Sequence, residues 1–172
     1  MRAQVSLQCV INANAQFWEQ MLAMTMEAMP SAEEFRLEAG HMVGSVAMSG
    51  VWTGRIEVRL AGGLAYAATA AMLMQALDTV AEADALDATK EIANMIAGTI
   101  KSSLPRPCSM SVPEAAVDGE GFCGGAATAD SLDVVFRHAA GEMVVRVVEQ
   151  ECGGVDGNDA LSGFEEAART RA

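Results

Sequence analysis

Residues 87–105 constrain the fold most strongly, because their apolar side chains recur at i, i+3, i+4 and i+7, the spacing of a helix with one buried face. The expected buried stripe consists of Ile92, Met95, Ile96, Thr99, Ile100 and Ser103. We assign Asp87 as the N-cap, since its carboxylate can accept a hydrogen bond from an unpaired backbone N–H of the first turn. We place the end of the helix at Leu104, because a residue that precedes proline is pushed out of the helical region.

The opposite face of this helix carries Glu91, Asn94, Gly98 and Lys101. Glu91 and Asn94 are three residues apart, so their side chains lie next to each other. The small residues Ala97 and Gly98 allow another backbone to come close. The spacing alone favours an ordinary solvated face, although asparagine is a poor helix former with no local benefit at an interior position. The second interpretation is a docking or catalytic pair.

At 172 residues the chain is long enough for a single domain with a substantial core. We expect this domain over residues 1–150, followed over residues 151–172 by a C-terminal tail that we expect to be mobile. No apolar run reaches the ~18 residues that a membrane span needs, and the N-terminus lacks the long apolar region of a signal peptide. We therefore expect a cytoplasmic protein.

The net charge of −12 argues against nucleic acid and against an anionic membrane surface as partners, because both need clustered lysine and arginine. The cysteines are widely spaced, form no C-x2-C pair and are expected to be reduced. They are Cys9, Cys108, Cys123 and Cys152. Besides these, the chain holds only two histidines, so we expect no metal site.

The N-terminal half is expected to form two helices around a group of strands. The first helix is expected over 9–26, and strands with a glycine-bounded hairpin over 33–60. Residues 63–77 are apolar nearly all round, which predicts a helix that is buried or lies at a subunit contact. An acidic link over 78–86 leads into the central helix. The face expected to be buried in the first helix consists of Ile11, Ala15, Trp18 and Leu22.

Downstream of the central helix the sequence is expected to return to strands. Residues 108–112 are a short strand and 119–125 a glycine-rich turn, while 132–137 and 143–148 are strands joined by a tight hairpin. The order helix, strands, helix, helix, strands predicts an α+β fold with helices packed on a mostly antiparallel sheet.

The central helix also resembles a known family. Its D-x3-E-x2-N pattern, formed by Asp87, Glu91 and Asn94, resembles the signature of the CheC/CheX family of chemotaxis phosphatases. The pattern occurs once, as in CheX-type proteins, whereas CheC-type proteins carry two. Where the broader signature has a proline this chain has Val117, and its nearest proline is Pro113, which we interpret as a loop shortened by four residues.

The resemblance extends to roughly residues 5–150. It includes the hairpin over 44–58, the alanine-rich helix over 65–73, the M-I-A-G-T-I-K run over 95–101 and the S-V-P run over 111–113.

The resemblance implies a CheC/CheX-like fold and hydrolysis of the aspartyl phosphate of a CheY-type response regulator. Asn94 would position the attacking water and Glu91 would dock on the regulator's active-site lysine. Gly98 and Lys101 would contact the partner. No cofactor is expected on this chain, since Mg²⁺ would sit on the regulator, and a homodimer is implied. The alternative is a non-catalytic binding or scaffold module for a receiver domain, because proteins of the flagellar switch share this fold.

Overall fold

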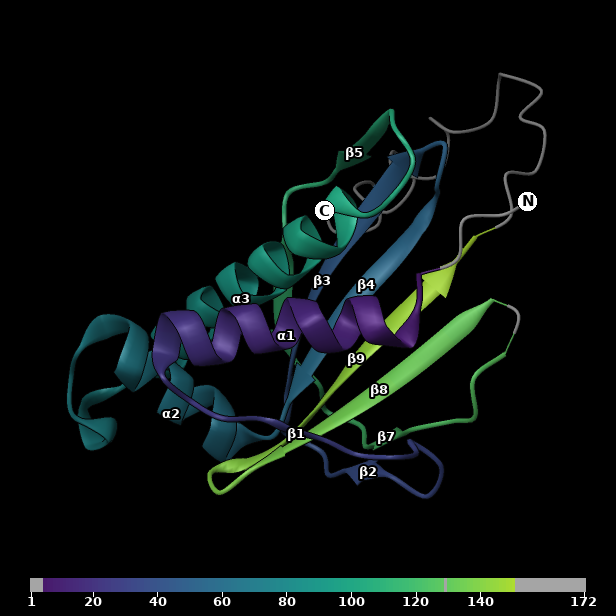
Figure 1. Ribbon diagram of the computed structural model, residues 1–172. Helices are drawn as coiled ribbons and strands as arrows, with labels where there is room; N and C mark the ends of the chain where they lie inside the picture. The colour runs from purple at the N-terminus through teal and green to yellow at the C-terminus, as the bar shows by residue number, and fades with distance from the viewer. Residues whose placement is uncertain (1–4, 129, 151–172) are drawn as a thin grey trace, which may run out of the picture.

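The computed structural model describes residues 5–128 and 130–150 of the chain (Figure 1). In these residues the α-helices are α1 (Leu7–Leu22), α2 (Gly62–Leu73) and α3 (Glu82–Ser102), with the short 3₁₀-helix η1 (Leu77–Thr79) between the last two. The strands are β1 (Glu27–Ala28), β2 (Arg36–Leu37), β3 (Met42–Gly50), β4 (Gly54–Leu60), β5 (Cys108–Met110), β6 (Glu114–Val117), β7 (Phe122–Cys123), β8 (Ser131–His138) and β9 (Gly141–Glu149).

Most of the described strands form one antiparallel sheet. Its strands lie in the order β1-β8-β9-β4-β3-β5, and β6 also pairs with β3. Helices α1 and α3 lie across one face of this sheet, with α3 over β3 and β4 and α1 over β8 (Figure 1). This arrangement confirms the predicted α+β fold with helices on a mostly antiparallel sheet.

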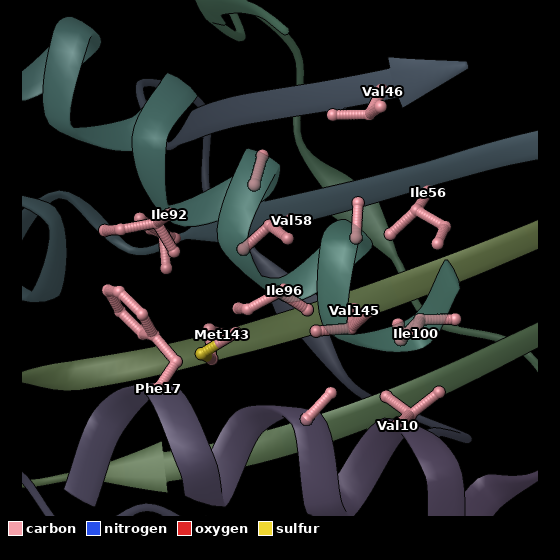
Figure 2. Close-up of a cluster of buried hydrophobic side chains, with 14 of the residues drawn as sticks. Val10, Phe17, Val46, Ile56, Val58, Ile92, Ile96, Ile100, Met143 and Val145 are labelled. Carbon is pink, nitrogen blue, oxygen red and sulfur yellow. The ribbon is translucent and has the colours of Figure 1, made fainter. Parts of the chain in front are cut away.

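The main core lies between the helices and the sheet (Figure 2). Ile92, Ile96 and Ile100 of α3 are fully buried, which confirms the isoleucines of the predicted stripe. Burial of an isoleucine side chain stabilises a fold by about 1.5–3 kcal/mol relative to exposure, so this face anchors α3. The neighbours that complete this part of the core include Val10, Phe17, Val46, Ile56, Val58, Met143 and Val145.

The other face of the sheet is covered in part by the separate two-stranded ribbon of β2 and β7. Leu37 and Phe122 from this ribbon pack with Val135 and Val144, the outward-facing residues of β8 and β9. The guanidinium groups of Arg59 and Arg146 lie 4.6 and 4.5 Å from the centre of the Phe122 ring. Strands β8 and β9 thus bury residues on both of their faces.

Helix α3 begins earlier than its sequence pattern predicts. It starts at Glu82, so the prediction of an acidic link over 78–86 is wrong for residues 82–86. Ala85, Ala88 and Thr89 are buried and continue the apolar stripe toward the N-terminus. The difference arises because alanine is the best helix former and fills a buried position without a large side chain.

The prediction that Asp87 caps this helix is also wrong. The N-cap position is Ala81, which makes no side-chain capping bond. Asp87 lies inside the helix with its side chain exposed, and its Oδ1 is 3.1 Å from the Nζ of Lys90. An exposed pair of this kind contributes only a few tenths of a kcal/mol, roughly 0.3–0.5, so Asp87 is not important for the helix end.

Helix α1 differs from its prediction in bounds and in its buried face. It is capped by Ser6, whose Oγ accepts from the Cys9 N–H 3.2 Å away, and it ends at Ala23 in the left-handed region. Of the predicted buried residues only Trp18 is fully buried, while the others are partly exposed. The reason is that α1 contacts both α3 and β8. Its buried residues are Val10, Ala13, Asn14, Phe17 and Trp18.

The sequence patterns did not reveal β1, β6, β7 and η1, which are too short to show a period. Strand β7 lies within residues 119–125, so the prediction of a turn there is wrong for Phe122 and Cys123. The predicted tail over 151–172 lies outside the described residues, so its boundary stays a prediction. None of the helices in the described ranges is both long and apolar enough to cross a membrane.

Candidate functional site

The exposed face of α3 carries the predicted site residues in one line. Glu91 is exposed, and Asn94, Gly98 and Lys101 are half-buried. With 3.6 residues per turn, these positions follow one another along the same side of the helix, away from the buried isoleucines. We call Glu91, Asn94, Gly98 and Lys101 the α3 stripe.

The polar groups of Glu91 and Asn94 have no partner among the residues that the structure describes. Neither side chain makes a hydrogen bond or ion pair with any residue of 5–128 or 130–150. A carboxylate and a carboxamide therefore lie one helical turn apart and are both free to contact another molecule. Because Ile92, Ile96 and Ile100 on the opposite face are buried, the helix that presents the pair is held firmly on the sheet.

The surface around the stripe is hollowed on the side of β5 and β6. A Cβ added to Gly98 would meet nothing within 4 Å, so the space above this glycine is open. Beyond it lies a hollow bounded by Lys101, Arg106 and Ser109. A second hollow lies beside the N-terminal half of the stripe and includes Lys90 among its lining residues.

The residues across these hollows were not predicted from sequence. Arg106 and Ser109 reach the stripe because β5 pairs with the end of β3, the strand that lies beneath α3. Glu114 borders the second hollow because β6 pairs with the start of β3. Only the prolines near them signalled turns, and nothing local in the sequence places either segment against α3.

The described residues on the stripe include no cluster that could bind a metal ion and no histidine. In residues 5–128 and 130–150, no three His, Cys, Asp or Glu side chains are placed to hold a metal ion. His41 is buried, with its Nε2 3.1 Å from the Nη1 of Arg59, and His138 accepts from the Ala140 N–H. Among the described residues, neither histidine belongs to the stripe or lines either hollow beside it.

The model of the family "Chemotaxis phosphatase CheX" matches residues 42–131, which is more than half of the chain. The chain belongs to the CheX family. The matched segment runs from β3 to the first residue of β8 and contains the whole of α3 with its stripe. No curated protein sequence matches the chain.

Solved CheX structures share the fold at low sequence identity. A CheX protein from Vibrio vulnificus is 17% identical with a TM-score of 0.68, over 87% of this chain and 99% of that one. CheX from Desulfovibrio desulfuricans is 19% identical with a TM-score of 0.63, over 83% and 97%. The CheX–CheY–BeF3–Mg²⁺ complex from Borrelia burgdorferi matches at 15% identity and a TM-score of 0.64, over 86% and 100%. These likenesses confirm the CheX-like fold.

At one position this chain departs from the family signature. Val117, where the broader signature has a proline, is the last residue of β6 and pairs with Met42. Pro113 comes directly before β6. This departure from the signature lies beside the second hollow and does not change Glu91 or Asn94.

Proposed function

We propose that this CheX-family protein hydrolyses the aspartyl phosphate of a CheY-type response regulator bound on the α3 stripe. The observation that carries the proposal is the pair of unpartnered polar groups, Glu91 and Asn94, presented together by a helix whose opposite face is buried. The family match and the fold shared with the Borrelia CheX of the CheX–CheY complex support this function.

Asn94 positions the attacking water. Its carboxamide can donate and accept hydrogen bonds at once, so it can hold a water in line with the scissile P–O bond. Positioning and charge stabilisation account for most of the catalysis of phosphoryl transfer. One well-placed amide of this kind is worth about a hundredfold in rate. Because Asn94 is half-buried on α3, its side chain has less freedom than that of an exposed residue.

The chemistry explains why the stripe needs no acid or base of its own. The oxygen of water bonds to phosphorus as the bond from phosphorus to the aspartyl oxygen breaks. The aspartate leaves as a carboxylate, whose usual pKa of about 3.9 means that it needs no proton. Both protons of the water stay with the phosphate. This balance fits a stripe whose neighbouring hollows are lined by no histidine of the described residues.

Glu91 orients the regulator. Its exposed carboxylate can pair with the regulator's active-site lysine, which fixes where α3 lies over the phosphoryl group. The Mg²⁺ on the regulator would neutralise charge on the phosphoryl oxygens. The open space at Gly98 admits the regulator's loops, and Lys101 lies at the rim of the contact.

We also propose that the protein forms a homodimer and is located in the cytoplasm. The dimer is a property that the family resemblance implies, and receiver domains of the CheY type work in the cytoplasm. Light scattering on the purified full chain tests the dimer directly. A mass equal to that of one chain at all concentrations would contradict it.

The function is tested by the decay of phosphorylated receivers from the same organism. The wild-type protein should accelerate loss of phosphate, and Asn94→Ala should bind the receiver yet lose about a hundredfold of the acceleration. Glu91→Gln should weaken binding and slow the reaction. Glu82→Gln is the matched control, because it makes the same charge change at the exposed start of the same helix.

Binding by the wild type without any effect on decay would contradict the phosphatase and support the scaffold function. Equal decay with the wild type and with both Glu91→Gln and Asn94→Ala would show that the pair is not the site.

A further inference from the structure

The hollow at the C-terminal end of the stripe is cationic in a protein that is strongly acidic. The described residues that line it include Gly98, Lys101, Ser102, Arg106, Cys108 and Ser109, and none of these described residues carries a carboxylate. The whole chain holds 23 Asp and Glu against 11 Lys and Arg. Two of these few cations therefore face one hollow, which we call the Lys101–Arg106 hollow.

Both cations lack an internal carboxylate partner. In the described part of the chain, the lysines and arginines that form ion pairs are Lys90, Arg55, Arg59, Arg137 and Arg146. The described cations outside such pairs are Arg36, Lys101 and Arg106. Arg36 lies in the β2–β7 ribbon and donates to the carbonyl oxygen of Phe35. Two of these three cations, Lys101 and Arg106, thus line the same hollow at the end of the stripe.

Stabilisation of α3 explains the presence of Lys101 in the hollow, but not that of Arg106. Lys101 is in the last turn of α3, where a positive charge interacts favourably with the helix dipole. Arg106 lies beyond the helix end and does not have this role. An exposed arginine that faces a lysine across a hollow experiences repulsion, which an external anion would relieve.

The distance along α3 between Asn94 and Lys101 indicates which anion the hollow binds. Lys101 is seven residues beyond Asn94, which corresponds to about 10 Å along the helix at 1.5 Å per residue. A phosphoryl group held at Asn94 therefore lies about two helical turns away from the hollow that Lys101 and Arg106 line. A folded partner docked along α3 covers both points and can present a second anionic group there.

We propose that Lys101 and Arg106 together bind an acidic side chain on the surface of the receiver domain, and that this contact determines which receivers the protein accepts. This proposal depends on the proposed function only for the way in which the receiver docks along α3. An arginine can bind a carboxylate through two parallel hydrogen bonds, and the lysine adds a second charge. Such a contact at the rim of an interface affects association and its dependence on salt more than it affects the chemical step.

Charge reversal with a matched control tests the proposal. Arg106→Glu and Lys101→Glu are compared with Arg36→Glu, which makes the same charge change at the exposed and equally unpaired arginine of the other sheet. The probe is the beryllofluoride-activated receiver for binding and the phosphorylated receiver for turnover. Circular dichroism checks that each variant folds, and Arg106→Lys is the conservative variant.

We expect Arg106→Glu and Lys101→Glu to raise Kd and KM by roughly tenfold and to leave kcat within about twofold. The increase should shrink as salt rises from 50 to 300 mM, because the contact is exposed and therefore screened. Arg36→Glu should match the wild type, and Arg106→Lys should recover most of the affinity. Equal Kd values for Arg106→Glu and Arg36→Glu would overturn the proposal.

The two proposals fail in different ways. A wild-type protein that binds the receiver without speeding its decay disproves the phosphatase, while a higher Kd for Arg106→Glu would still support the hollow. A wild-type protein that speeds decay with no effect of either reversal disproves the hollow alone. Failure of the wild type to bind any receiver of the organism overturns both.

Discussion

Gly44 on β3 lies directly against Thr89 on α3. A Cβ added to Gly44 would be 2.7 Å from the backbone oxygen of Thr89 and 2.9 Å from the Cβ of Ala93, distances that real side chains do not adopt. The helix that carries the stripe therefore rests on the bare backbone of this strand. The position of Glu91 and Asn94 relative to the sheet depends on this contact.

Gly44→Ala should destabilise the protein, because the methyl group must push α3 away from β3. The expected loss is about 1–3 kcal/mol in the free energy of unfolding, measured by urea denaturation. Phosphatase activity should fall as well, since the stripe moves with its helix. An unchanged midpoint in urea would mean that α3 can shift without cost.

Gly98→Ala, on α3, should have the opposite effect on stability from Gly44→Ala. A Cβ at this position meets nothing within 4 Å, so the substitution removes only the poor helix propensity of glycine. Stability should increase by about 0.5–1 kcal/mol. Gly98→Leu should keep this stability but weaken binding of the activated receiver, because its side chain fills the open space. Tight binding by Gly98→Leu would show that the receiver does not approach Gly98.

The true and the predicted helix caps should respond differently to alanine. Ser6→Ala removes the bond from its Oγ to the Cys9 N–H, with an expected cost of about 1 kcal/mol in the free energy of unfolding. Asp87→Ala loses only an exposed pair with Lys90 and should change stability by less than about 0.5 kcal/mol. Thermal unfolding of the two variants, side by side, makes the comparison.

Asp118 should make stability depend on acid pH. The backbone N–H of Glu120 and then the Arg59 guanidinium, 2.6 Å from Oδ2, hold the pKa of the Asp118 carboxyl below its ordinary value of 3.8. A carboxyl with a lowered pKa contributes stability at pH values above its unfolded pKa, and this contribution is lost as pH falls through the folded pKa.

Asp118→Asn should therefore be less stable than the wild type at pH 7, with a difference that shrinks as pH falls below about 4. Urea denaturation at a series of pH values provides the measurement. A difference that stays constant down to pH 2 would mean that the carboxylate charge does not contribute.

The candidate site was predictable in part because helical periodicity is local. The spacing of Ile92, Ile96 and Ile100 predicted that these three side chains are buried, and the structure confirms it. The same spacing placed Glu91 and Asn94 on the exposed face. The β3–β4 and β8–β9 hairpins were predictable for the same reason, since alternation and turn residues lie within one short stretch.

Local patterns of residues were thus enough to predict the buried isoleucines of α3 and the hairpins, and composition was enough to show that the chain is acidic. Tertiary structure alone decided where α3 begins, which face of α1 is buried and which residues border the stripe. Arg106 reaches Lys101 because β5 pairs with the end of β3, far away in the sequence, and α3 packs over that strand. Strand order and packing depend on contacts between distant segments, and no local pattern of residues encodes them.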